Sequence, residues 1–86
     1  MSDDLSRERE LLADLGGAAN VSRIDPCITR LRVEVLDPTG VDDAALKEHG
    51  AFGVVRSGRV VQIVVGPEAD HLAERIEQVR YGADGR

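Results

Sequence analysis

The chain is poor in aromatic residues and has a single cysteine. Of its 86 residues, 42% are hydrophobic but only 2% are aromatic, so the core must rest on Val, Ile, Leu and Ala. The one thiol, Cys27, excludes an internal disulfide framework, and no pairing of Cys and His has the spacing of a zinc site. We therefore expect a protein of a reducing compartment that needs no metal and no other cofactor.

Long hydrophobic runs and an excess of positive charge are also missing. The longest apolar run, residues 60–66, is interrupted by Gln62 and is too short to cross a bilayer. The acidic N-terminus lacks the basic start of a secretory signal. A net charge of −5 argues against general binding to nucleic acid or to an anionic membrane. We predict one small domain that acts in the cytoplasm.

Positive charge gathers around the only cysteine. Residues 23–32 hold three arginines and one acid, whereas residues 1–14 hold five acids and two arginines. Within the first segment, residues 25–32 read Asp-Pro-Cys-Ile-Thr-Arg-Leu-Arg. Nearby cations and hydrogen-bond donors favour a thiolate, and arginine forks match the geometry of a phosphate. The motif therefore predicts that Cys27 accepts a phosphoryl group.

A buried and unreactive thiol is the commoner role of a lone cysteine. Here Asp25-Pro26 favours a turn, which would place Cys27 at the head of a strand. Apolar and charged residues alternate over residues 28–36, so Arg30 and Arg32 would project from one face. Charged residues usually form a solvated strand face. Directly after a turn cysteine, they indicate a receptor for negative charge.

Hydrophobic periodicity and turn residues predict the order helix, strand, strand, helix, strand, strand, helix. The first predicted helix is capped by Ser6 and ends at Gly16-Gly17, and it is followed by strands 21–25 and 28–36, joined by a turn at Pro26–Cys27. A second helix lies within 41–49, and strands 52–56 and 59–65 follow it, joined by Ser57-Gly58. The last helix has its apolar stripe over 69–79. Two antiparallel hairpins covered by helices give an α+β two-layer sandwich, a four-stranded antiparallel sheet with three helices on one face. We expect a flexible start over 1–5, one domain over 6–81 and a flexible tail over 82–86.

The chain resembles the IIB domain of the glucose-type sugar phosphotransferase system of bacteria. The phosphorylation-site pattern of that family is an acidic residue, any residue, Cys, an apolar residue and Thr-Arg-Leu-Arg, which stands here at 25–32. Further matches are Leu15-Gly16-Gly17, Asn20-Val21, Leu46-Lys47, residues 50–55 and residues 61–66. The resemblance covers the chain from about residue 8 to residue 80, and it implies the same α+β fold.

The resemblance also implies a function. In that family the IIB cysteine takes a phosphoryl group from a phosphohistidine of a IIA protein and passes it to a sugar imported through a membrane-embedded IIC partner. Cys27 would be the phosphocysteine, and Arg30 and Arg32 would serve mainly the onward transfer to the sugar. Ile28 and Thr29 would bind the phosphoryl oxygens. The sugar would be of the glucose or N-acetylglucosamine class, and the chain would act as a monomer that visits the inner face of the membrane through IIC.

Two further residues are accessory candidates, and two are not. Asp25 could tune Cys27 or serve only as a turn former. Gln62 could reach the site from the sheet face. The two histidines, His49 and His71, lie outside the motif, and we expect surface or packing roles for both.

Other readings of the motif stay open. A regulatory IIB-like module would use the phosphorylation state of Cys27 to control a protein partner. A thiol redox protein would use a reactive Cys27, although the chain has no resolving cysteine. The chain could be a separate polypeptide or a domain of a larger permease, and its start at Met1 favours the first.

Overall fold

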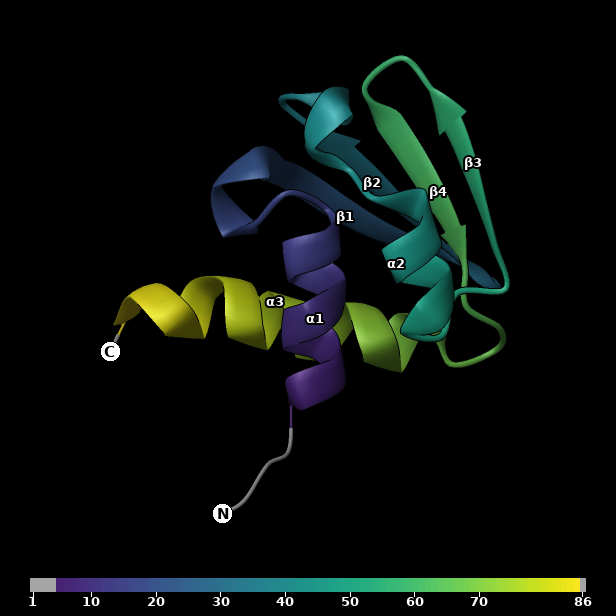
Figure 1. The fold of residues 1–86 in the computed structure, drawn as a ribbon. Helices are drawn as coiled ribbons and strands as arrows, with labels where there is room; N and C mark the ends of the chain where they lie inside the picture. Colours follow the sequence, from purple (N-terminus) through teal and green to yellow (C-terminus); the bar gives the residue numbers. More distant parts are fainter. Residues whose placement is uncertain (1–4, 86) are drawn as a thin grey trace.

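The computed structural model describes residues 5–85, and its helices and strands follow the predicted order (Figure 1). In chain order the elements are α1 (Ser6–Asp14), the short 3-10 turn η1 (Ala18–Asn20), β1 (Val21–Cys27), β2 (Arg30–Val35), a second 3-10 turn η2 (Pro38–Gly40), α2 (Asp43–Glu48), β3 (Gly53–Ser57), β4 (Val60–Val64) and α3 (Ala69–Gly85). Most of the predicted flexible start and the final residue, 1–4 and 86, lie outside the described residues.

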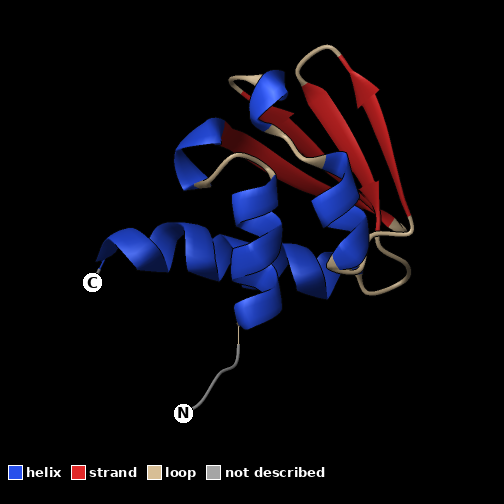
Figure 2. Ribbon diagram, viewed as in Figure 1, coloured by secondary structure: helices blue, strands red, loops and turns tan. Residues whose placement is uncertain are grey.

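The four strands form one antiparallel sheet in the spatial order β1-β2-β4-β3. The three α-helices lie on the same side of this sheet, and the other side is left without a covering layer (Figures 1 and 2). The predicted two-layer α+β fold is therefore confirmed. A sheet covered on one side alternates buried and exposed side chains, as β2 does.

The core lies between the helices and the covered sheet face, and it contains no aromatic side chain. Its most deeply buried members are aliphatic and come from both layers: Leu11, Leu15, Leu31, Val33, Leu46, Val61, Ile63, Leu72 and Ile76. Burying a side chain of this size contributes about 1.5–3 kcal/mol each. The core composition expected from the scarcity of aromatic residues is confirmed.

A single asparagine joins the end of α1 to the loop after β2. The Asn20 Nδ2 group donates to the carbonyl oxygens of Leu15 at 2.8 Å and Asp37 at 3.0 Å. The backbone N–H of Asp37 donates in return to Asn20 Oδ1 at 2.8 Å. Gly16 makes room for this contact, since a Cβ atom there would lie 2.4 Å from Asn20 Nδ2, and its φ of +102° suits glycine. The glycine pair thus ends the helix, as predicted, and also admits the asparagine.

The predicted boundaries are wrong in several details. The hairpin loop between β3 and β4 is Gly58–Arg59 rather than Ser57-Gly58, because Ser57 still pairs with Val60. Helix α1 begins at Ser6 itself, with Leu5 in the cap position. Helix α3 continues to Gly85, so the backbone of 82–85 is helical where a tail was expected. The division into 1–5, 6–81 and 82–86 stays a prediction.

His49 connects α1 to the C-terminal end of α2. Its Nδ1 atom lies 2.5 Å from Asp14 Oδ2, and its Nε2 atom lies 3.3 Å from Glu10 Oε1. The Arg7 Nε–H donates to the His49 carbonyl oxygen at 3.0 Å. The hydrogen bond to Asp14, helped by the charges of Asp14, Glu10 and Glu48, raises the pKa of His49 above 6.5. A surface or packing role was expected for His49, and in the structure it forms an ion-paired link between α1 and α2.

This link predicts a pH-dependent stability. Because the pKa of His49 is higher in the folded chain than its ordinary value of 6.5, its contribution is fully present below that pH and is lost as the pH rises through the folded value. Urea unfolding at a series of pH values should show the free energy of unfolding falling above about pH 6.5. The variant His49→Gln should lose this fall and His71→Gln should keep it. An equal fall in His49→Gln would show that another group is responsible.

Candidate active site

Cys27 is the last residue of β1, and its side chain is exposed. The predicted turn at Pro26–Cys27 is wrong, because Pro26 still pairs with Leu31 and Cys27 pairs with Arg30 across the hairpin. The two-residue loop is Ile28–Thr29. The cysteine therefore ends one strand instead of heading the next.

The proline is accommodated because β1 is an edge strand of the sheet. Proline has no N–H to give to a neighbouring strand, so it is found at sheet edges, where that position faces away from the ladder. Pro26 thus fixes the backbone just before Cys27 without interrupting the pairing with β2. In the sequence alone, Asp-Pro predicts a turn, because the position of this strand at the edge of the sheet is not visible there.

The residue after the cysteine has an unusual backbone conformation. Ile28 has a φ of 58°, and it is the only residue other than glycine with positive φ in the described chain. In a two-residue hairpin loop with positive φ at the first position only, glycine is the usual occupant. A β-branched residue there is strained by about 1–3 kcal/mol. Its side chain is 84% exposed, so packing does not compensate for the strain.

The loop is held in place by the segment between β4 and α3. The carbonyl oxygen of Thr29 accepts hydrogen bonds from the backbone N–H groups of Val65, at 2.9 Å, and Gly66, at 3.0 Å. Phe52 lies at the same end, since its N–H donates to the Val64 carbonyl oxygen at 2.8 Å. Phe52 is 78% exposed, and its ring lies next to Gly66, whose N–H bonds to the Thr29 carbonyl oxygen. The sequence pattern did not identify Phe52, the one phenylalanine of the chain, as a residue near the site.

The two arginines of the motif lie on the uncovered sheet face, as predicted. Arg30 pairs with Cys27, and residues directly opposite each other in an antiparallel sheet point to the same side. Arg32 pairs with Gln62 of β4. The Arg30 Nη1 group donates to Gln62 Oε1 at 3.3 Å. The structure therefore brings Gln62 to the motif, and this side chain can orient Arg30.

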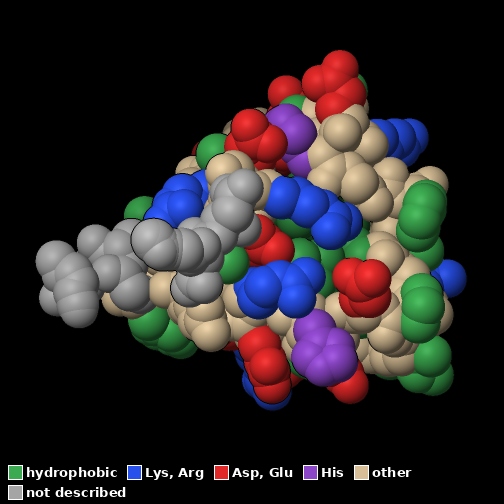
Figure 3. All heavy atoms as spheres, turned by 90° about the horizontal axis from the view of Figure 1, so that it is seen from below, with side chains coloured by type: hydrophobic (Ala, Val, Ile, Leu, Met, Phe, Trp, Pro, Cys, Tyr) green, Lys and Arg blue, Asp and Glu red, His purple; other side chains and the backbone are tan. Residues whose placement is uncertain are grey.

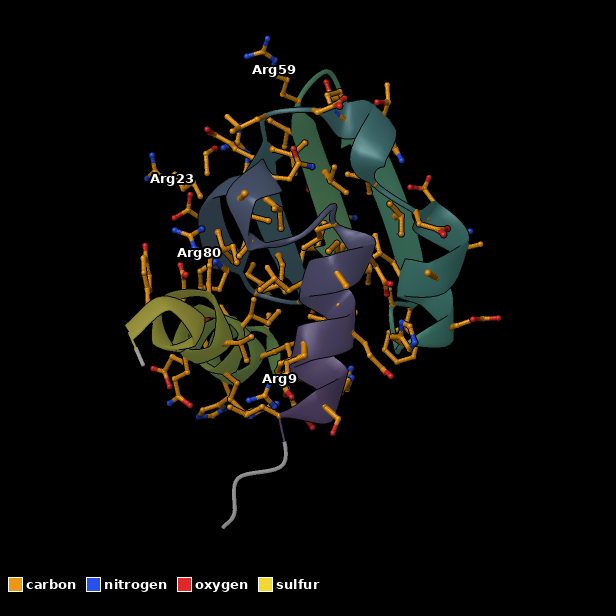
Figure 4. All side chains as sticks on the ribbon, turned by 60° about the vertical axis from the view of Figure 1, so that its left-hand side comes forward. Arg9, Arg23, Arg59 and Arg80 are labelled. Atoms are coloured by element: carbon orange, nitrogen blue, oxygen red, sulfur yellow. The ribbon has the colours of Figure 1, made fainter. Side chains whose placement is uncertain are left out.

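Exposed ion pairs lie farther along β1 and β2 on this face. Arg32 Nη1 lies 3.6 Å from Glu34 Oε2, and Arg23 Nε lies 2.8 Å from Asp25 Oδ2. Figure 4 shows Arg23 reaching away from the sheet. Ion pairs as exposed as these contribute about 0–1 kcal/mol. Arg32 can therefore leave Glu34 at little cost when a dianion arrives.

Charged side chains elsewhere in residues 5–81 are mixed in sign and form no metal site. On the lower side of the molecule, acidic, basic and histidine side chains are interspersed (Figure 3). Among the side chains that the structure describes, no three of the His, Cys, Asp and Glu residues gather in a way that could hold a metal ion. Within residues 5–85, every helix is too short or too polar to span a bilayer.

These features define a small α+β domain that presents a thiol and two guanidinium groups at one end of an uncovered sheet. The chain is similar to several known proteins. The family model "phosphotransferase system, EIIB" matches residues 9–42. The N-acetylglucosamine-specific EIIB component of the PTS system of Streptomyces coelicolor is 49% identical over 74 residues, which are 86% of this chain and 96% of that protein. A crystal structure of one domain of the PTS system IIabc component from Clostridium difficile has a TM-score of 0.68 at 25% identity, covering 93% of this chain and 80% of that one.

This chain belongs to the EIIB family of the phosphotransferase system. It is a phosphocarrier in sugar phosphotransfer, and as a phosphotransferase it falls in the EC 2.7.1 class. EIIB components work with IIA and IIC partners. The family resemblance read from the cysteine motif is thereby confirmed.

The strained loop predicts that stability can be gained beside the cysteine. Ile28→Gly should raise the free energy of unfolding by about 1 kcal/mol, because relief of strain exceeds the added backbone entropy of glycine in the unfolded chain. The control Ile28→Val keeps the β-branch and should change it by less than about 0.5 kcal/mol. Urea titration monitored by circular dichroism measures both. A loss of stability in Ile28→Gly would mean that the isoleucine fits this loop without strain.

Proposed function

We propose that Cys27 is the phosphocysteine of this EIIB component. The observation that carries the proposal is the pairing of Cys27 with Arg30, which sets an exposed thiol beside a guanidinium group on one sheet face. The arginine adds charge for a phosphoryl dianion, and the uncovered face leaves space for a donor protein. Cys27 stands at the position of the phosphorylated cysteine in the family motif, which supports the same assignment.

The first chemical step is the acceptance of the phosphoryl group. The Cys27 thiolate attacks the phosphorus of a phosphohistidine on a IIA protein, the P–N bond breaks, and its electron pair stays on the imidazole nitrogen. Phosphoryl transfer passes through a loose transition state, so alignment and charge neutralisation are what the protein supplies. The N–H groups of Ile28 and Thr29 lie in the hairpin loop outside the strand ladder, where they can bind phosphoryl oxygens. The hydrogen bonds to the Thr29 carbonyl oxygen hold that loop still.

The second step passes the group to the sugar. A sugar hydroxyl attacks the phosphorus, the S–P bond breaks, and Cys27 leaves as a thiolate. The hydroxyl proton goes to a base outside this chain, on the IIC partner. Arg30 and Arg32 stabilise the charge on the transferring group, and Gln62 orients Arg30 through its hydrogen bond. Any effect of Asp25 on Cys27 is indirect, because the Asp25 carboxylate is already paired with Arg23.

The similar proteins also support a proposal for the sugar. The similarity to an N-acetylglucosamine-specific EIIB component supports N-acetylglucosamine as the sugar, with glucose as the related alternative. The chain would act as a monomer in the cytoplasm and meet the membrane only through IIC.

The assignment of Cys27 is tested by mapping the phosphoryl group. The protein is incubated with phosphoenolpyruvate, the general phosphotransferase components and a matching IIA, and then digested for mass spectrometry. One phosphoryl group should be found on the peptide that contains Cys27 and should be absent in Cys27→Ser. A phosphoryl group that persists in Cys27→Ser would disprove the assignment, and a stable phosphocysteine that never reaches a sugar would favour a regulatory module.

The arginines are tested by separating the two steps. Arg30→Lys and Arg32→Lys should each slow sugar phosphorylation about tenfold or more, since lysine cannot reproduce the bidentate fork at the transition state. Phosphorylation of Cys27 by IIA should change less than about threefold. The matched controls are Arg23→Lys and Arg59→Lys, whose side chains extend into solvent (Figure 4), and both should leave sugar transfer within about threefold of the original. Unchanged transfer in both motif variants would remove the role assigned to these arginines.

A further inference from the structure

A groove runs between the edge strand β1 and helix α3, on the opposite side of β1 from the Cys27 thiol. Its volume is about 780 Å³, and Ile24 and Pro26 form its strand side. Because side chains alternate along a strand, these two point toward the helices while Cys27 points to the uncovered face. The groove therefore reaches the residue next to the cysteine without occupying the face on which the thiol lies.

The helix side of the groove is acidic over an apolar floor. Ala73 and Tyr81 supply apolar surface, and the ring of Tyr81 is 61% exposed. Asp70, Glu74 and Glu77 line the same groove at helical spacing, so their carboxylates follow one face of α3. A groove with this lining suits a partner segment that is both apolar and positively charged.

The negative charge is concentrated at the end nearest Cys27. Helix α3 runs antiparallel to β1, because Gly66, just before it, bonds to the loop after Cys27, whereas Arg80 near its other end donates to the Val21 carbonyl oxygen at 3.4 Å. Arg80 also lies 3.2 Å from Glu77 Oε1.

Figure 4 shows Arg80 between α3 and the sheet. Its guanidinium group lies 4.7 Å from the centre of the Tyr81 ring. The far end of the groove thus has its own cation. Asp70 and Glu74 are exposed, and neither forms an ion pair within the described part of the chain.

We propose that this groove docks a Lys/Arg-rich cytoplasmic segment of the membrane-embedded IIC partner. The inference rests on the proposed function, in which Cys27 delivers its phosphoryl group to a sugar held by IIC. Cytoplasmic segments of membrane proteins carry an excess of Lys and Arg, and those beside the bilayer also carry apolar residues. Such a segment matches both the acidic wall and the apolar floor. The uncovered face stays free, so the phosphoryl group can reach the sugar while IIC holds the groove.

The test compares the two transfer steps in charge-reversal variants of the full chain. Glu74→Lys removes an exposed groove carboxylate, and Glu48→Lys makes the same charge change on the exposed surface of α2. Membrane vesicles that contain an N-acetylglucosamine-type IIC component serve as acceptor. Glu74→Lys should raise the KM for the phosphorylated protein about three- to tenfold, whereas Glu48→Lys should change it less than twofold. The difference between the two variants should shrink at high salt, because exposed charges are then screened.

Phosphorylation of Cys27 by IIA is measured on the same proteins and separates the two proposals. If the original chain is not phosphorylated on Cys27, the proposed function itself fails. If it is phosphorylated and Glu74→Lys transfers to the sugar with an unchanged KM, the groove proposal alone fails. If Glu74→Lys impairs acceptance from IIA to the same extent, the occupant is the donor and the proposal is overturned.

A photoreactive benzophenone residue in place of Gln78, an exposed groove residue, identifies the occupant directly. Irradiation with the IIC vesicles should attach the chain to a Lys/Arg-rich cytoplasmic peptide of IIC. Attachment only to IIA or to acidic IIC peptides would contradict the proposal.

Discussion

The antiparallel pairing of β1 with β2 is the constraint on which the site depends. With a side-chain period of two, the pairing of Cys27 with Arg30 also fixes the faces of the hairpin residues from Arg23 to Glu34, up to the irregularity in pairing between Val21 and Arg23. A slip of β2 by one residue would turn both arginines toward the core and expose Leu31 and Val33, which are fully buried. The burial of those aliphatic residues therefore selects the register that presents the chemistry. Stability and function are set by the same alternation.

The surroundings of the hairpin limit how far the cysteine loop can move. Two backbone N–H groups of the segment before α3 hold the Thr29 carbonyl oxygen, and proline stiffens the strand before the thiol. At the opposite end of the sheet, Asn20 ties the end of α1 to the loop after β2. A loop fixed in this way can offer its N–H groups to a phosphoryl group without first becoming ordered, which is the advantage of a preorganised site.

The sequence predicted the element order and the uncovered face correctly, because hydrophobic alternation and helical periodicity act locally. It misplaced the turn, because Asp25-Pro26 is a turn signal in isolation and is compatible with a strand only at a sheet edge. The strand order that makes β1 an edge is a long-range property. The groove beside α3 also could not be foreseen, since it depends on the antiparallel course of that helix along β1. His49 was expected to have a packing or surface role, but its ion-pair partners on α1 could not be predicted, because they are distant in sequence.

The most direct test of the carrier role is a single-turnover chase. The protein is phosphorylated with ³²P, separated from its donor, and mixed with IIC vesicles and N-acetylglucosamine. The label should leave Cys27 and appear on the sugar at the same rate and in equal amount, with the thiol regenerated. Label that stays on the protein, or that appears only as inorganic phosphate, would contradict a role of this chain in delivering the phosphoryl group to the sugar.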